Sequence, residues 1–148
     1  MKRSLWIIAA LLLISACFAV WHLTTRTEVA RGELLIRQGE AEVRLCLTDL
    51  DLSRVQGEVV DGKGDTHAVD AQGLSVADVV RAAGLDVNAL TQLTVTAGDA
   101  YSAVLSGDEV RQSETAWLIL QDGGARLIVF GDPDSRRNVS DVAILEAE

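Results

Sequence analysis

The sequence predicts an α+β fold, with a mostly antiparallel or mixed β-sheet, one or two short helices, and a single N-terminal transmembrane helix ahead of them. Three observations support this prediction. After residue 32, short segments of alternating apolar and polar residues recur between turns rich in Gly and Asp. One segment, residues 74–85, has the apolar spacing of an amphipathic helix. A long uncharged apolar run precedes all of them.

That apolar run predicts a membrane anchor over residues 1–25. Its strongly apolar part, Leu5 to Leu23, has 19 residues, roughly 28 Å as a helix and about one bilayer hydrocarbon core. Lys2 and Arg3 precede it, and cationic flanks stay in the cytoplasm. We therefore expect a single-pass protein of the bacterial cell membrane, whose C-terminal part is periplasmic.

Two alternatives for this segment remain open. The stretch "ISAC", ending at Cys17, resembles the lipobox of bacterial lipoproteins, in which the cysteine is lipidated. A cleavable signal peptide is the third reading. All three place the remaining chain outside the cytoplasm, as a tether over residues 26–32 and a domain over residues 33–148.

The charge of the remaining chain limits its partners. Of the 13 basic residues of the whole chain, only Lys2 and Arg3 precede Thr25, and no acidic residue does. The part after Thr25 therefore has 11 basic and 22 acidic residues, a net charge of −11. A field of this sign repels phosphate backbones, so nucleic acid is not an expected partner. Two cysteines and two histidines form neither a disulfide framework nor a zinc signature.

The first part of the domain predicts two hairpins. Strands over 34–37 and 41–47 flank a turn at Gln38-Gly39, and strands over 57–60 and 66–69 flank a turn at 61–64. Between them, "TDLDLSRV" predicts a short helical turn capped by Thr48.

The clearest helix prediction is the segment "LSVADVVRAAGL". Ser75 is a natural N-cap, and Asp78, three residues later, is its capping-box partner. Val76, Val79, Val80 and Ala83 line one apolar face, and Gly84 supplies a left-handed stop. These features predict a short helix packed on a sheet.

The C-terminal half predicts further strands. In "TVTAGDAYSAVLSGDEV", Gly98-Asp99 connects two strands, and Tyr101 begins the second on the same face as Ala103 and Leu105. "SGDEVRQ" then favours a helical turn. "TAWLILQ" and "ARLIVF" flank a "DGG" turn, "GDPDSRRN" is a surface loop, and "VSDVAILEA" is a last strand.

This order of elements resembles a known family. The segments "GLSVADVVRAAGL", "VTAGDAYSAVLSGDEV" and "AWLILQDGGARLIVFGDPDSRRNVSDVAILE" are similar to the molybdopterin-binding oxidoreductase domain of the sulfite oxidase family. The resemblance covers roughly 45–146 and implies a sulfite oxidase-like fold. It also implies molybdopterin as a cofactor, with molybdenum held by a cysteine at the end of the strand ahead of the capped helix.

The sequence departs from that family at the metal. The comparable segment, "GEVVDGKGD", has no cysteine, and Cys46 lies earlier, in "VRLCLTDL". Cys46 is thus the only candidate for a metal ligand, and its alternative role is that of a small half-buried strand residue. Without the ligand cysteine, we expect no catalytic residue and no bound cofactor, with molybdopterin as the alternative.

Four residues are candidates for ligand binding: Asp99, Tyr101, Arg136 and Arg137. Asp99 and Tyr101 occupy the place of the family's "DGY" turn, although a turn aspartate also bonds its own backbone and a strand tyrosine also packs with its hydroxyl in water. Adjacent arginines clamp a carboxylate or phosphate, or else pair with Asp132, Asp134 or Asp141.

The sequence therefore supports three functional hypotheses. The first is a membrane-anchored, non-catalytic binding or accessory module that contacts a small ligand or a membrane-protein partner. The second is a small molybdopterin-dependent oxidoreductase that uses Cys46 or an unusual ligand. The third is a structural subunit of a membrane complex.

Overall fold

The computed structural model describes residues 11–17, 20 and 29–148. Residues 11–17 and Val20 are helical, and the rest of the expected membrane anchor lies outside the described residues. Within the described ranges, no helix has both the length and the apolar character needed to cross a bilayer. The membrane anchor therefore stays a prediction.

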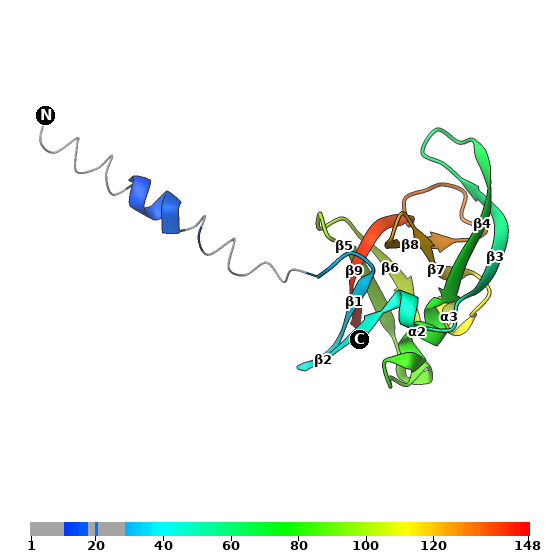
Figure 1. Ribbon diagram of the computed structural model, residues 1–148, viewed down its shortest axis with the longest axis horizontal. Coiled ribbons are helices and arrows are strands. Elements are labelled where there is room, and N and C mark those ends of the chain that lie inside the picture. The colour runs from blue at the N-terminus through cyan, green and yellow to red at the C-terminus, as the bar shows by residue number, and fades with distance from the viewer. Residues whose placement is uncertain (1–10, 18–19, 21–28) are drawn as a thin grey trace, which may run out of the picture.

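Nine strands form one sheet, in which the order along the main path is β2-β1-β9-β8-β7-β4-β3 (Figure 1). Their bounds are β1 Glu33–Gln38, β2 Ala41–Cys46, β3 Ser53–Val60, β4 Thr66–Ser75, β5 Gln92–Ala97, β6 Ser102–Ser106, β7 Ala116–Gln121, β8 Gly124–Val129 and β9 Val139–Ala147. The helical elements are η1 Leu47–Asp49, α2 Val76–Ala82, η2 Val87–Ala89 and α3 Gly107–Arg111. The predicted α+β class is confirmed.

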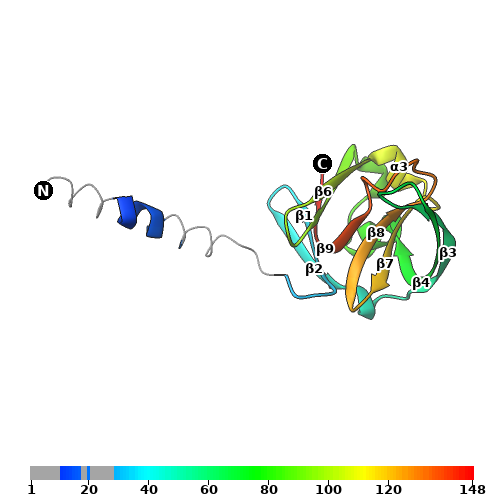
Figure 2. The ribbon, with the colours of Figure 1, turned by 90° about the horizontal axis from the view of Figure 1, so that it is seen from above.

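Strand β9 connects the parts of the sheet. It pairs with β1 in parallel and with β5 and β8 in antiparallel orientation. All other pairings are antiparallel, so the sheet is mixed, as predicted. Figure 2 shows the strands curving around a common interior.

The main core fills that interior with side chains from most strands and from α2. Leu34, Val79, Leu93, Leu118 and Leu127 are all fully buried in it. The burial of α2 follows the predicted apolar stripe, because Val76, Val79 and Val80 are buried while Asp78 and Arg81 carry the polar face. Helix α2 packs on β4 and β7 and also contacts α3 and η2.

A second, smaller core lies on the other face of β7 and β8. The long β3–β4 hairpin covers this face with Val55, Val59, Val69 and Ala71, which pack near Ile119 and Ile128. Gly57 makes the close approach possible, because a Cβ there would lie 2.5 Å from Cε1 of Phe130. Strands β7 and β8 are therefore buried on both faces, which explains their nearly continuous apolar sequences.

The prediction of a helical turn capped by Thr48 is wrong in extent. Only a single 3₁₀ turn forms, over Leu47–Asp49, and its N-cap is Cys46 with no side-chain capping bond. The chain then becomes extended, because β3 begins at Ser53 and pairs along its whole length with β4, with Ser53 opposite Gly73. Cross-strand pairing outweighs the weak local preference for a helical turn.

The position of Tyr101 also differs from the prediction. Strand β6 begins at Ser102, so Tyr101 lies in the turn and is 48% exposed, whereas Ala103 and Leu105 are buried. The left-handed residue of this turn is Ala100, with φ 72°. That backbone twist removes Tyr101 from the alternating face of the strand.

The helix caps show how side-chain length matters. Ser75 caps α2 by accepting a hydrogen bond from the Asp78 backbone N–H, as predicted, but its hydroxyl also donates to the Asp78 carboxylate. In α3, the longer Glu109 reaches back to the Ser106 N–H and completes the reciprocal capping box. Gly84 has φ 79°, as expected of a left-handed stop after α2.

Candidate functional site: a pocket between two hairpins

A pocket opens where the β3–β4 hairpin leaves the sheet. Strand β4 pairs with β7 only over Gly73–Ser75, and the remainder of β4 pairs with β3 alone. Gly73 permits the last close contact, since a Cβ there would lie 2.6 Å from the carbonyl oxygen of Leu118. Beyond it the two hairpins diverge around a cavity of about 490 Å³. Figure 1 shows the β3–β4 hairpin standing away from β7 and β8.

We call this cavity the hairpin pocket and define it by six lining residues, two from each of three parts of the sheet. They are Val59 and His67 from the β3–β4 hairpin, Ile119 and Gln121 from β7, and Arg126 and Ile128 from β8. Ile119 and Arg126 are direct cross-strand partners, so their side chains leave the same face of the sheet. The pocket is the unfilled end of the second core.

Arg126 has an unusual environment within the hairpin pocket. Its only hydrogen bond in the described part of the chain runs from Nη1 to Oε1 of Gln121, at 3.0 Å. Its Nε is buried and has no partner. Each of the other eight described arginines forms an ion pair with a carboxylate. A partly buried guanidinium with an unused donor is energetically costly unless a ligand satisfies it.

The acidic residues of the pocket are mostly engaged elsewhere. Asp61 accepts a hydrogen bond from Nε2 of His67 at 2.8 Å and two from backbone N–H groups. These bonds, the one with His67 foremost, lower the pKa of Asp61. Asp70 pairs with Arg54 at 2.5 Å, and hydrogen bonding from Arg54 lowers the pKa of Asp70. Both carboxylates stay ionised and both have partners other than Arg126.

The four residues predicted to bind a ligand lie elsewhere, around the loop 130–138. The Tyr101 hydroxyl donates to the backbone carbonyl of Arg136 at 2.5 Å, and Asp99 accepts from the Tyr101 N–H at 3.0 Å. The Arg136 side chain is 86% exposed and pairs with Asp134. None of the four lines the hairpin pocket, so a ligand role for them stays a prediction.

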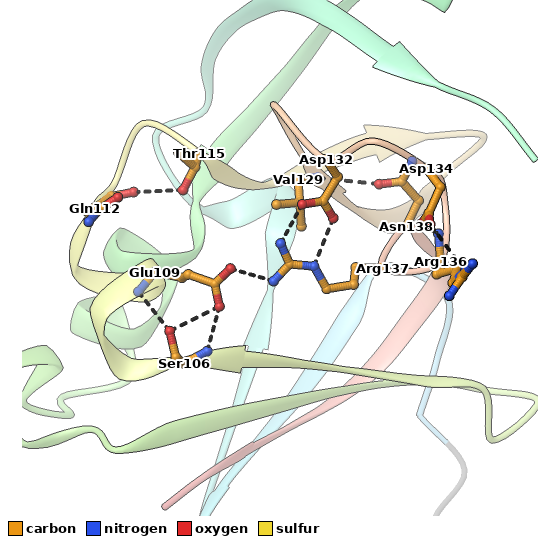
Figure 3. Close-up of polar contacts among 10 residues, drawn as sticks. All are labelled: Ser106, Glu109, Gln112, Thr115, Val129, Asp132, Asp134, Arg136, Arg137 and Asn138. Carbon is orange, nitrogen blue, oxygen red and sulfur yellow. Dashed lines mark hydrogen bonds and ion pairs between the residues drawn. The ribbon is translucent and has the colours of Figure 1, made fainter. Parts of the chain in front are cut away.

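Arg137 is the central residue of a charge cluster that ties this loop to α3 (Figure 3). Its guanidinium donates to both carboxylate oxygens of Asp132 and to Glu109. Hydrogen bonds to Asp132 and Glu109 raise the pKa of Arg137 above its ordinary value. The predicted pairing of the two arginines with neighbouring aspartates is confirmed, and Glu109 is a partner that the sequence analysis missed.

Neither cysteine lies at this pocket. Cys46 ends β2, is partly buried, and has its Sγ 3.1 Å from Oγ1 of Thr48. Cys17 is exposed in the helical segment 11–17. Among the residues that the structure describes, no group of three or more His, Cys, Asp or Glu side chains is arranged to hold a metal ion.

Comparison with solved structures finds the sulfane dehydrogenase SoxCD from Paracoccus pantotrophus, with a TM-score of 0.63 and 14% sequence identity. The match is one of fold. It covers 82% of this chain but only 40% of the sulfane dehydrogenase chain. It agrees with the resemblance to a molybdopterin oxidoreductase domain that the sequence indicates. No protein-family model and no curated protein sequence matches this chain.

The donor set of the pocket does not fit the molybdenum site that the resemblance implies. The segment comparable to the family's cysteine-bearing strand contributes Val59, Val60 and Asp61 to the pocket, but no thiol. Asp61 is already bonded to His67. A thiolate-held molybdenum therefore has no ligand here, and we derive no chemistry through it.

Arg126 is the residue of the hairpin pocket that the sequence analysis missed. It lies in "ARLIVF", the predicted partner of the strand "TAWLILQ", where it is the only charged residue. Because β7 and β8 are apolar at successive positions, both of their faces are covered. A single arginine in such a strand must lie on a covered face, and this signal was available without the structure.

Proposed function

We propose that the chain is a membrane-tethered, extracytoplasmic binding module on a molybdopterin-oxidoreductase-like scaffold, and that it is not itself a redox enzyme. The observation that carries this proposal is the hairpin pocket, which has a guanidinium without a counter-ion and no thiol among its lining residues. The tether and the location rest on the apolar run from Leu5 to Leu23 behind Lys2 and Arg3.

Binding in this pocket divides into two tasks. Arg126 attracts an anionic group, while Gln121 holds Nη1 of Arg126 and orients the guanidinium plane. Ile119 and Ile128 form an apolar wall beside it. An apolar pocket with a few placed polar groups is the usual form of a small-ligand site. The ligand is held and released without chemical change.

A small molybdopterin-dependent oxidoreductase is the competing function, and the fold similarity to a sulfane dehydrogenase favours it. Metal analysis separates the two. We expect the full chain, purified from membranes, to contain no stoichiometric molybdenum and to release no pterin fluorescence after denaturation. Stoichiometric molybdenum or pterin would overturn the binding-module proposal.

The pocket itself is tested by the small molecules that co-purify with the chain. Mass spectrometry of the extract should find an anion enriched with the wild type and with Arg44→Gln, but not with Arg126→Gln. Arg44 is a matched control, because it pairs with Glu33 and does not line the pocket. Equal extracts from all three chains would contradict a ligand role for Arg126.

The third hypothesis, a structural subunit of a membrane complex, predicts a different outcome. In that case membrane proteins co-purify in fixed ratio with the intact chain, and Arg126→Gln does not change the small-molecule extract. The location is tested separately, by fusing after Glu148 a reporter enzyme that is active only outside the cytoplasm. An inactive reporter would overturn the proposed topology.

A further inference from the structure

We propose that the ligand of the hairpin pocket is a small monocarboxylate with an apolar body, whose carboxylate binds the guanidinium of Arg126. This inference rests on the proposed binding function and names the ligand class for the same pocket. Three features of the lining support it: an unpaired arginine, an apolar wall and an acidic rim.

The first feature selects a planar anionic group. Nη2 of Arg126 makes no hydrogen bond and, unlike Nε, is not buried. Gln121 leaves one N–H of Nη1 unused as well, because it accepts only one bond. A guanidinium that keeps unused donors on both Nη1 and Nη2 matches the two oxygens of a carboxylate.

The second feature selects a ligand with a hydrocarbon part. Ile119 and Ile128 are 5% and 1% exposed and meet Val59 and Val69 from the opposite hairpin in the second core. All four also line the pocket. A ligand that extends this apolar contact gains from the removal of hydrocarbon surface from water, which an inorganic oxyanion cannot do.

The third feature selects a single negative charge. Asp61, Asp70 and Asp122 stand in the same lining as Arg126. His67 and Arg54 bond the first two, but Asp122 forms no ion pair in the part of the chain described. A second carboxylate or a phosphate dianion would meet these like charges at close range, where screening by salt is weakest.

The negative field of the whole domain does not prevent such binding. Charges farther than about 8 Å from the pocket are largely screened at physiological ionic strength. A monocarboxylate therefore meets mainly the local charges, and among the residues that line the pocket Arg126 is the one cation without a carboxylate partner. Affinity should be modest and should rise slightly with salt, the opposite of a site on a basic protein.

The experiment is a titration of the full chain, purified in mild detergent, with hexanoate, acetate, succinate, sulfate and phosphate. Binding is measured by isothermal titration calorimetry and by the side-chain Nε–H signal of ¹⁵N-labelled arginine. We expect hexanoate to bind at least tenfold more tightly than each of the other four probes. We expect it to move a single arginine signal, which is absent from Arg126→Gln.

Variants separate the charge from its geometry. Arg126→Gln should weaken hexanoate binding by tenfold or more, and Arg126→Lys, which keeps the charge but lacks the planar fork, should weaken it severalfold. Asp122→Asn should strengthen hexanoate binding and should raise the affinity for succinate even more. Arg44→Gln is the matched control and should bind as the wild type does.

Each failure has a distinct meaning. If sulfate or phosphate binds more tightly than hexanoate and Arg126→Gln abolishes that binding, the monocarboxylate is wrong but the proposed binding function stands. If succinate exceeds hexanoate, the assigned role of the acidic rim is wrong and so is the ligand class. If no probe binds and no arginine signal moves, both the ligand class and the anion pocket are overturned.

Discussion

Replacing Arg137 by glutamine should destabilise the domain by about 2–3 kcal/mol, because it breaks the charge cluster between the loop 130–138 and α3. The side chains of Arg137, Asp132 and Glu109 are 31%, 13% and 35% exposed. A hydrogen bond to a charged group contributes about 1.5–3 kcal/mol. The better-buried pair with Asp132 should therefore supply about 2 kcal/mol. The more exposed pair with Glu109 should supply about 0.5–1 kcal/mol, close to a surface ion pair.

The assay is thermal and urea unfolding of the full chain, followed by circular dichroism. A loss of 2–3 kcal/mol corresponds to a fall in Tm of about 10 °C for a domain of this size. Arg136→Gln is the control, because the Arg136 side chain is 86% exposed and its replacement should change the stability by less than about 0.5 kcal/mol. A double-mutant cycle with Asp132→Asn should give a coupling of about 1.5 kcal/mol.

Two results would refute this reasoning. One is an Arg137→Gln variant as stable as Arg136→Gln, which would mean that solvent replaces the cluster at no cost. The other is an unchanged Tm together with lost binding of a small anion. Arg137 would then hold a ligand, as one reading of the sequence expects, and not the loop.

Three further predictions concern packing, acid and the free thiol. Gly107→Ala should lower the free energy of unfolding in urea by about 3 kcal/mol or more, because the added Cβ would lie 2.0 Å from the Leu90 carbonyl oxygen. Gly98→Ala is the control and should be nearly neutral, because no atom lies within 4 Å of the added Cβ. Burial opposes ionisation of Glu109, but hydrogen bonds from Arg137 and Ser106 lower its pKa below the ordinary 4.5. Stability should therefore be constant above about pH 5 and fall below pH 4.5, less steeply in Glu109→Gln. Cys46→Ser should leave Tm and ligand binding unchanged, and a large loss of either would restore Cys46 as a functional residue.

Local structure was readable from the sequence wherever a single residue decides it. The turns at Gly39, Gly64 and Gly123 all have positive φ, as glycine permits. Ser75 caps α2 where predicted. One error occurs where a distant partner decides, since Ser53 enters a strand only because β4 lies beside it. The other, at Tyr101, arises because the left-handed residue of the turn is Ala100 and not a glycine.

The topology was beyond such reasoning. Strand β9 pairs not only with β8, the strand before it, but also with β1 and β5, which are distant in sequence, and no local pattern specifies those two choices. The resemblance to a molybdopterin oxidoreductase domain supplied what periodicity could not, and the solved sulfane dehydrogenase agrees with it in fold. A resemblance in fold does not carry function with it, because function depends on the residues placed at the site.

The difference between the two arginine regions shows why the sequence directs attention to the loop 130–138 and not to the hairpin pocket. Arg136 and Arg137 attract attention in the sequence because they are adjacent and lie in a loop, yet nearby carboxylates neutralise both. Arg126 lies within an apolar strand and forms no ion pair in the described part of the chain, although Asp61, Asp70 and Asp122 line the same pocket. In an acidic domain, nearly every surface arginine finds a carboxylate within reach. A cation without such a pair is the exception, and an external anion is the partner for which its unused donors leave room.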